Sequence, residues 1–461
     1  MSLPLGADGL ATAYLDGSST PEAEVERVLG AIDQLDPTLE AWQVVYADEA
    51  RAAAQAATTA IRTGHRAGPF HGVPFALKDI VDLEGRVTTA GSKAWSERIS
   101  PATAEIAKRL LAAGGILLGK TKTVEFALGG WGTNQHMGTP RNPWDATDPR
   151  VPGGSSSGSG VAVASGMAAC AIGTDTGGSV RLPAGLCGIV GLKTTEGQLP
   201  TDGIVPLSHT LDTPGPMARS VADAALMYDV LTGRNSVDID TDWRNTSGLY
   251  RELQRGVRGL QLGAMPDAER AMTEPEVLAD YDRALETLAG LGAEISVFNP
   301  PLPFDEMKEM TFVIVTAEAY FHHKLLYDDP SAPLDEACRA RGLPGKNQSA
   351  HDYVAAHQQR AADIKEFLAA MTPFDAVLTP TTPMTAPTHA EVDEDLTPAH
   401  FTRAGNYLGL CGLSLPAGLS PQGLPTSLQI LGRGNAEELV LRIGSAFEAA
   451  NDPIGPPPIS A

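Results

Sequence analysis

Hydrophobic positions near the N-terminus recur at the spacing of an amphipathic helix. Four aliphatic residues open the pattern: Val25, Val28, Leu29 and Ile32. An alanine-rich run from Ala47 to Ala60 follows, and Asp36-Pro37 lies between the two. Apolar residues three and four positions apart share one helix face, and a proline favours a break. We therefore predict two helices between Pro21 and about Arg62.

Beyond residue 66, short apolar runs alternate with helical patterns. Gly72-Val-Pro-Phe-Ala-Leu-Lys78 and Gly115-Ile-Leu-Leu-Gly119 indicate buried strands, and Ala104 to Ala113 between them indicates a helix. The alternation continues to about Leu231. It is typical of an α/β fold whose sheet is covered by helices on both faces.

The pattern becomes mostly helical between residues 233 and 372. Strand-like runs return from Phe374 to Pro383 and from Leu424 to Leu431. Because no linker-like stretch separates these regions, we predict a single domain over residues 1–461. Its four parts are N-terminal helices (1–66), a core (67–232), a helical segment (233–372) and a return to the sheet (373–461).

The charge composition of the chain excludes one class of binding partner. The chain has 34 Lys and Arg residues against 56 Asp and Glu residues, a formal net charge of -22. Such a surface repels a phosphate backbone, so we expect no nucleic-acid partner.

No apolar segment approaches the roughly 20 residues of a membrane span, and the N-terminus lacks a secretory pattern, so we expect a cytoplasmic protein that does not bind a membrane. Four widely spaced cysteines fit reduced thiols: Cys170, Cys187, Cys338 and Cys411.

Two loops rich in glycine and serine are candidates for chemistry. Pro152-Gly-Gly-Ser155-Ser-Ser-Gly-Ser-Gly160 precedes a run with helical pattern (161–171), and Gly173-Thr-Asp-Thr-Gly-Gly-Ser179 follows it. Backbone N–H groups in such loops can approach a developing negative charge closely. A serine after two glycines is placed to attack an acyl carbon while nearby N–H groups hold the oxyanion. Ser179 is therefore the candidate nucleophile.

The nucleophile requires a base, and neither loop contains a histidine. Lys78 ends an apolar strand, where burial lowers the pKa of a lysine toward the range of a general base. Serine activated by lysine is a known variant of the serine–histidine arrangement.

In these segments the chain resembles the amidase signature family, and the resemblance covers nearly the whole length. The family combines a Gly-Val-Pro-x-x-x-Lys-Asp strand, a Gly-Gly-Ser-Ser loop and a Gly-Thr-Asp-x-Gly-Gly-Ser-Val-Arg loop, which stand here at Lys78, Ser155 and Ser179. The two serines are 24 residues apart (179 − 155), as in the family. Further matches include Asp212-Thr-Pro-Gly-Pro216 and Leu415-Pro-Ala-Gly418.

The resemblance implies a fold and a catalytic triad. The fold is one large, mixed, mostly parallel β-sheet flanked by helices on both faces, with residues 233–372 on the substrate side. Ser179 would attack the acyl carbon, Ser155 would relay the proton, and Lys78, neutral at rest, would be the base. No cofactor and no metal ion are implied.

The resemblance also implies backbone donors for the oxyanion. The oxyanion would be held by the N–H groups of Thr176, Gly177, Gly178 and Ser179. Three further residues would support the loops: Ser156, Asp175 and Arg181. We expect Asp175 and Arg181 to form a buried ion pair rather than to react.

The chain departs from the family pattern at a few positions. Ser157 and Thr194 replace a usual glycine and proline, and Cys411-Gly412 stands where a proline and a small residue are usual. The triad is intact. Ser157 is the departure that bears on the backbone of the first loop.

Two other motifs match formally. Gly114-Gly-Ile-Leu-Leu-Gly119-Lys-Thr121 fits the phosphate-loop pattern, but its middle indicates a buried strand rather than a flexible loop. Gly154-Ser-Ser156-Ser-Gly158 fits the nucleophile elbow, but no strand precedes it directly. We therefore favour Ser179 over Ser156 as nucleophile.

Three functions remain open, and we favour the first. It is a hydrolase of the acyl C–N bond of a small amide or carbamate, with a homodimer as one option for its assembly. The second is the ammonia-generating component of a tRNA-dependent amidotransferase. The third is a non-catalytic binding protein on the same fold, which the intact triad disfavours.

Overall fold

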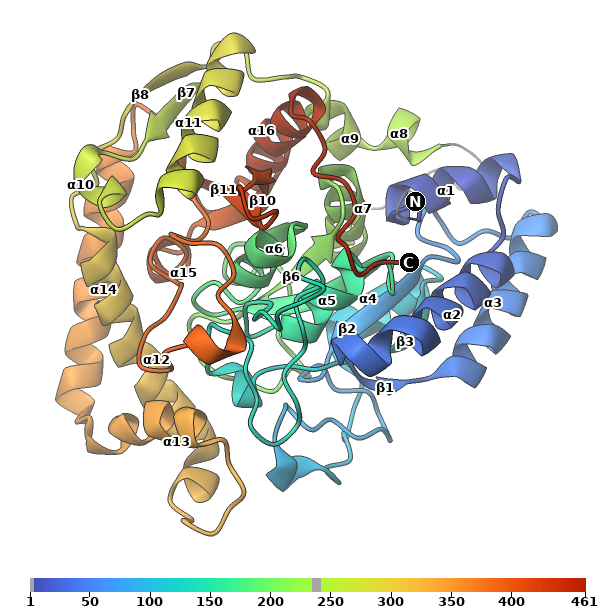
Figure 1. The fold of residues 1–461 in the computed structure, drawn as a ribbon, viewed down its shortest axis with the longest axis horizontal. Coiled ribbons are helices and arrows are strands. Elements are labelled where there is room, and N and C mark those ends of the chain that lie inside the picture. Colours follow the sequence, from blue (N-terminus) through green and yellow to red (C-terminus); the bar gives the residue numbers. More distant parts are fainter. Residues whose placement is uncertain (1–3, 234–241) are drawn as a thin grey trace.

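A computed structural model describes residues 4–233 and 242–461, and within them eleven strands form one sheet (Figure 1). The strand order is β1-β3-β2-β4-β6-β5-β10-β11-β9-β7-β8. The strands are β1 (Trp42–Val45), β2 (Pro74–Lys78), β3 (Ile116–Thr121), β4 (Cys170–Asp175), β5 (Val190–Lys193), β6 (Thr213–Ala218), β7 (Gln261–Ala264), β8 (Glu294–Val297), β9 (Ala376–Pro380), β10 (Cys411–Leu419) and β11 (Pro425–Gly432).

Helices surround this sheet, with α2 and α3 beside β1 and β3 at one end and α12 to α14 toward the other (Figure 1). The helices are α1 (Ala7–Asp16), α2 (Pro21–Leu39), α3 (Ala47–Arg62), α4 (Glu105–Ala112), α5 (Ser157–Ala164), α6 (Arg181–Cys187), α7 (Val221–Thr232), α8 (Trp243–Thr246), α9 (Gly248–Leu253), α10 (Asp267–Arg270), α11 (Pro275–Gly290), α12 (Phe304–Tyr327), α13 (Glu336–Gly342), α14 (Ala350–Ala370), α15 (Arg403–Tyr407) and α16 (Glu437–Ala450). The described residues also form four short 3₁₀ turns: η1 (Lys93–Trp95), η2 (Glu125–Ala127), η3 (Leu343–Asn347) and η4 (His389–Glu391).

The sheet is large and mixed, as predicted, but parallel pairing does not predominate. Six of its ten neighbouring strand pairs are antiparallel, and four are parallel. The β10–β11 pair shows the reason. A tight turn closed by the Ser420 N–H and the Leu424 carbonyl joins these strands, and so short a connection permits only antiparallel pairing.

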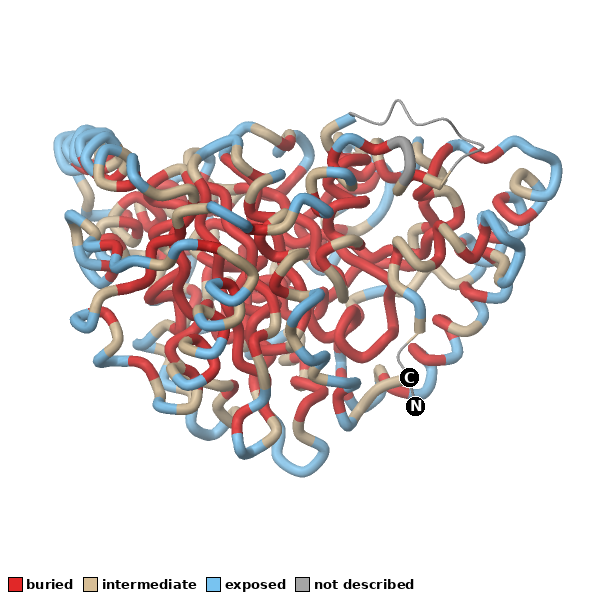
Figure 2. Tube along the Cα trace, turned by 90° about the horizontal axis from the view of Figure 1, so that it is seen from above, coloured by how far each residue is buried: buried red, intermediate tan, exposed pale blue. Residues whose placement is uncertain are grey.

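Helices cover both faces of the sheet, which confirms that prediction. Successive side chains of a strand point to opposite faces. Phe75 and Leu77 of β2 therefore join the larger buried cluster with α4, α7 and α16, whereas Ala76 joins a second cluster with α2, α3 and α5. Figure 2 shows the result, a buried centre with exposed loops and helix edges around it.

Several elements differ from their sequence-based predictions. The helix expected over 161–171 begins earlier and ends at Ala164, because Gly166, with a φ of 82°, turns the chain toward β4. Pro37 does not break α2, because it lies in the last turn and the helix ends at Leu39.

The segment 233–372, expected to be helical, also contributes two parallel strands, β7 and β8. β1 and α1 were likewise not predicted. The three strands have only four residues each, which is too short for a clear alternation.

Two smaller observations concern the chain as a whole. All four cysteines are buried and free in this structure. Across residues 4–233 and 242–461, no helix combines the length and apolarity needed to cross a membrane.

Candidate active site

The candidate site forms where two neighbouring parallel strands end. β2 pairs with β4 in parallel, with Leu77 opposite Ile172, so the carboxyl ends of both strands meet at one edge of the sheet. Lys78 ends β2 and Asp175 ends β4. Such edges are where open α/β sheets bind ligands, because the following loops lie close together there.

Lys78 is completely buried and contacts hydroxyl groups. Its Nζ lies 2.7 Å from Ser155 Oγ and 2.8 Å from Thr174 Oγ1. No ion pair joins Lys78 to any residue of the described chain. Burial lowers the pKa of Lys78 to about 7, and the charges of Asp212 and Asp175 oppose that shift only in part. A large fraction of this amine is therefore neutral near pH 7.

The loop that carries Ser155 and Ser156 is held from both sides. The peptide bond between Gly154 and Ser155 is cis, and a Cβ on Gly154 would lie 2.7 Å from the Gly132 nitrogen. Ser156 Oγ accepts from the Thr174 N–H at 3.2 Å, and the Ser156 N–H donates to the Ser179 carbonyl at 3.3 Å. Ser156 thus connects the two loops, and no strand precedes it directly.

Ser179 lies in the second loop and is 7% exposed, whereas Ser155 and Lys78 are fully buried. Within the described residues, Ser179 Oγ makes no hydrogen bond. The serine hydroxyl is therefore free for a substrate, and it forms no hydrogen bond to Ser155 Oγ in this state.

Backbone N–H groups of the second loop differ in their availability. Those of Thr176, Gly177 and Ser179 have no acceptor in the part of the chain that the structure describes. The Gly178 N–H, predicted as an oxyanion donor, instead donates to Asp175 Oδ1 at 2.8 Å. A charged carboxylate holds a donor tightly. In this structure the Gly178 N–H therefore holds the loop, and its role as an oxyanion donor stays a prediction.

Asp175 and Arg181 form the expected buried ion pair. Both side chains are fully buried, with two contacts of 2.9 and 3.0 Å between the guanidinium and the carboxylate. Burial raises the pKa of Asp175, but the charge and hydrogen bonds of Arg181 outweigh it and lower that pKa to about 2. Arg181 also donates to Gln429 at 2.8 Å and to Asn406 at 2.7 Å. The pair fixes the second loop to β11 and α15.

Two residues of the site were not singled out from sequence. Thr174 bonds Lys78, and Asp212 accepts a hydrogen bond from Thr176 Oγ1 and lies close enough to Lys78 to affect its pKa. Burial raises the pKa of Asp212 to about 6. Both residues line a small cavity of about 60 Å³, together with residues of 201–214. Only the family match at 212–216 offered a signal for Asp212.

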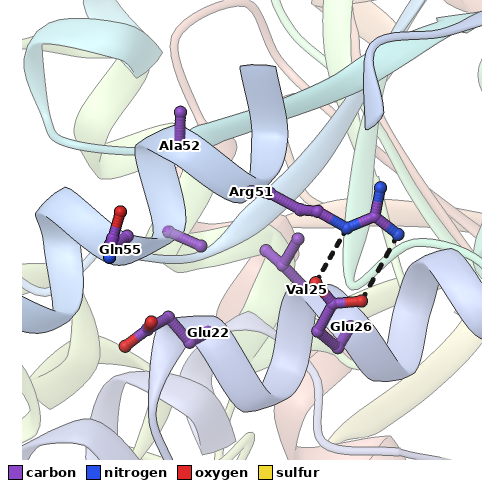
Figure 3. A pocket seen from close by; sticks show the side chains of 7 residues that line it. Glu22, Val25, Glu26, Arg51, Ala52 and Gln55 are labelled. Carbon is purple, nitrogen blue, oxygen red and sulfur yellow. Dashed lines mark hydrogen bonds and ion pairs between the residues drawn. The ribbon is translucent and has the colours of Figure 1, made fainter. Parts of the chain in front are cut away.

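A larger hollow lies elsewhere and has no comparable chemistry. This groove of about 260 Å³ between α2 and α3 is lined by polar and small side chains, with an exposed ion pair between Arg51 and Glu26 at 2.8 Å (Figure 3). It contains no buried titratable residue, in contrast to the site around Lys78.

Fold and site together define the class of protein. The chain belongs to the amidase family, whose model matches residues 23–441. The resemblance to the amidase signature family is confirmed. The protein is accordingly an enzyme of a family of C–N hydrolases.

Individual proteins of known name resemble the chain over most of their length. It is 34% identical over 481 residues to the A subunit of glutamyl-tRNA(Gln) amidotransferase from Synechococcus sp. (strain RCC307), covering 98% of this chain and 98% of the relative. It is 36% identical over 440 residues to 2-amino-5-chloromuconic acid deaminase of Comamonas testosteroni, covering 90% and 89%. A solved amidase structure superposes with a TM-score of 0.86 at 30% identity, covering 97% of this chain and 100% of that one.

Proposed function

We propose that the protein hydrolyses the acyl C–N bond of a small amide or carbamate through an acyl-enzyme on Ser179. The observation that carries this proposal is the contact of 2.7 Å between Ser155 Oγ and the buried, carboxylate-free Lys78 Nζ. A neutral amine in that position can accept a proton, whereas an amine in an ion pair cannot do so readily.

The proposed relay begins as Ser179 Oγ attacks the acyl carbon. Ser179 passes its proton to Ser155 Oγ, whose own proton moves to Lys78 Nζ. When the tetrahedral intermediate collapses, the same path returns a proton to the leaving amine. Water then attacks the acyl-enzyme and uses the relay again, releasing the acid and restoring Ser179. The Ser179 hydroxyl must approach Ser155 for this transfer, and catalytic hydrogen bonds commonly tighten when substrate binds.

The oxyanion would be held by backbone donors that have no other acceptor within the described residues. Those are the N–H groups of Thr176, Gly177 and Ser179. Asp175 and Arg181 would keep these donors in place through the ion pair, and Ser156 through its contacts to both loops. Preorganised donors of this kind contribute about 3–4 kcal/mol each to stabilising a tetrahedral intermediate.

The test is covalent labelling together with hydrolysis. We expect a fluorophosphonate probe to label Ser179, and the pure protein to release amine from an aryl amide or an aryl carbamate. Ser179→Ala should abolish the labelling and lower the rate by about a thousandfold or more. Ser156→Ala is the matched variant in the neighbouring loop and should still be labelled. Labelling that survives in Ser179→Ala would contradict the assignment of the nucleophile.

A second candidate function rests on the relatives. The Synechococcus amidotransferase component matches the chain end to end at 34% identity, and its name marks it as one part of a larger enzyme. Stable co-purification with another protein, together with release of ammonia from glutamine, would favour this candidate. A single-chain species, such as a homodimer, that hydrolyses amides without glutaminase activity would favour the first.

We also propose that residues 1–461 form one functional unit. The support is the sheet, to which the N-terminal part, the core, the segment 233–372 and the C-terminal part all contribute strands. Limited proteolysis checks this proposal, since separate domains would survive as stable fragments.

A further inference from the structure

Arg403, at the start of α15, is a half-buried cation next to the loop of the nucleophile. A Cβ on Gly177 would lie 3.3 Å from Arg403 Cγ and 3.6 Å from its Nε. The preceding residue, Thr402, donates from Oγ1 to the Gly177 carbonyl at 2.8 Å. The Arg403 side chain therefore lies beside Gly177, one of the proposed oxyanion donors. Gly177 is two residues before Ser179 in the chain.

The hydrogen-bonding capacity of Arg403 is largely unused. Of five N–H donors on a guanidinium, one donates to the Lys308 carbonyl of α12 at 3.0 Å. Nε and Nη2 have no acceptor in residues 4–233 and 242–461, yet neither is sealed away from solvent. The side chain forms no ion pair with a residue of these ranges. Donors that are both free and accessible remain available to a ligand.

Three other guanidinium groups each have acceptors for at least two of their nitrogens. Arg181 has a carboxylate and two amide oxygens, and Arg339 donates to three backbone carbonyls at 2.8 to 3.2 Å. Arg341, which lies beside Gly129, is paired with Glu394. Arg403 therefore differs from these three groups, because only one of its three guanidinium nitrogens has an acceptor in the described residues.

Burial and two nearby charges of opposite sign leave Arg403 cationic. Burial lowers the pKa of Arg403 to about 10, Glu309 opposes that shift and Arg341 adds to it. The group remains charged near pH 7 but is only partly hydrated. A carboxylate that binds there forms two parallel charge-assisted hydrogen bonds, and these are stronger and more directional than a bond to a neutral group.

We infer that Arg403 is a binding residue for a carboxylate on the substrate, so that the enzyme prefers amides whose reacting part also carries a carboxylate. This inference rests on the proposed function, because it names the substrate class of the same site. The reaction itself is unchanged: water is consumed, the acyl C–N bond breaks, and the carboxylate at Arg403 stays intact.

Succinamate and succinamide form a matched substrate pair, since they differ only in a carboxylate against a neutral amide at the far end. We expect kcat/KM of the wild type to be at least about tenfold higher for succinamate. Arg403→Gln should lower kcat/KM for succinamate by about 10- to 100-fold and change the value for succinamide by less than about threefold. For Arg403→Lys, kcat/KM for succinamate should lie between the values of the wild type and Arg403→Gln. Lysine keeps the positive charge but cannot form two parallel hydrogen bonds to one carboxylate.

Two controls separate binding from folding. Arg51→Gln removes a surface guanidinium in the groove between α2 and α3 and should leave both substrates unaffected. Fluorophosphonate labelling of Ser179 should be equally fast in the wild type and in Arg403→Gln when no other ligand is present. Equal losses of kcat/KM on both substrates in Arg403→Gln, or no loss on either, would overturn the inference.

Succinate gives a readout that does not need turnover. It should slow the labelling of Ser179 in the wild type but not in Arg403→Gln, and calorimetry should detect succinate binding in the wild type alone. Normal labelling without any effect of succinate would refute the role of Arg403 and leave the proposed function standing. Failure of Ser179 to be labelled, with succinate still bound through Arg403, would refute the proposed function instead.

Discussion

Two buried lysines at the ends of neighbouring strands have different partners. Lys78 of β2 and Lys120 of β3 lie in adjacent parallel strands, where Leu77 is opposite Lys120. Both are completely buried. Lys120 Nζ lies 2.9 Å from the Asp79 carboxylate, whereas Lys78 contacts only the hydroxyls of Ser155 and Thr174.

The difference shows that the partner, and not burial, separates a structural lysine from a candidate base. Burial lowers the pKa of both amines, and in Lys120 the adjacent carboxylate counteracts the shift directly. For Lys78 the nearest acids, Asp212 and Asp175, act only as more distant charges. A buried ion pair loses much stability when one partner is removed, whereas an unpaired amine can gain and lose a proton.

Replacing each lysine by methionine should give the largest contrast. We expect Lys78→Met to lower kcat for amide hydrolysis by about a thousandfold, because the proton relay loses its acceptor. Lys120→Met should retain most of the activity in the protein that remains folded. Rates normalised to the folded fraction check this, and a similar loss of kcat in both variants would contradict the comparison.

Lys120→Met should lower stability more than Lys78→Met does, which is the reverse of their order for the loss of activity. Lys120→Met leaves Asp79 as an unpaired buried carboxylate, so we expect the free energy of unfolding to fall by about 3–5 kcal/mol. Adding Asp79→Asn should recover part of the loss, since the amide oxygen can still accept from Thr89, which bonds Asp79 here. Urea denaturation of the single and double variants measures both steps. A double variant that is less stable than Lys120→Met would argue against the ion pair.

The pH profile should locate the titration of Lys78. The proposed base acts as the neutral amine, so kcat/KM should rise as pH increases through a value near 7, the pKa of Lys78. Thr174→Val removes an acceptor that stabilises the ammonium form, so the rise should move to lower pH. Thr174→Ser keeps a hydroxyl and should leave the profile in place. A wild-type profile that is flat between pH 5 and 9 would exclude Lys78 as the base.

The last expected effect is a pH dependence of stability that accumulates over several pH units. The pKa of Lys78 is about 7 in the folded protein and about 10.4 in an unfolded chain. Between these values the unfolded chain binds more protons, so wild-type stability should rise with pH. Below pH 7 the folded protein bears the full cost of a buried ammonium. Compared with wild type, Lys78→Met should therefore be most stable at low pH, with a change of at most about 1.4 kcal/mol per pH unit. Denaturation of both proteins at pH 6, 8 and 10 tests this.

Much of the fold was accessible from the sequence, because its strongest signals are local. The apolar runs at β2 and β3 and the helical spacing in α2 and α3 predicted those elements, and helices on both faces followed from their alternation. The short strands β7 and β8 and the balance of antiparallel pairing were missed. Strand direction depends on how chain segments far apart in sequence connect and pair, which periodicity does not record.

The candidate site also has parts that the sequence indicated and parts that it did not. Ordered motifs identified Lys78, Ser155 and Ser179, and their catalytic roles stay proposals that the experiments above test. Thr174, 96 residues from Lys78 in sequence, was not expected as its partner. The occupation of the Gly178 N–H by Asp175 and the free donors of Arg403 were also invisible in the sequence.

The sequence by itself determined which reactive groups the chain contains, the family to which it belongs and the strands and loops that carry those groups. Only the tertiary structure decided which groups meet. It placed a carboxylate beside Lys120 and hydroxyls beside Lys78. The physical reason is that a pKa and a free donor depend on distances of a few ångströms and on exclusion of water, and packing of strands remote in sequence sets both.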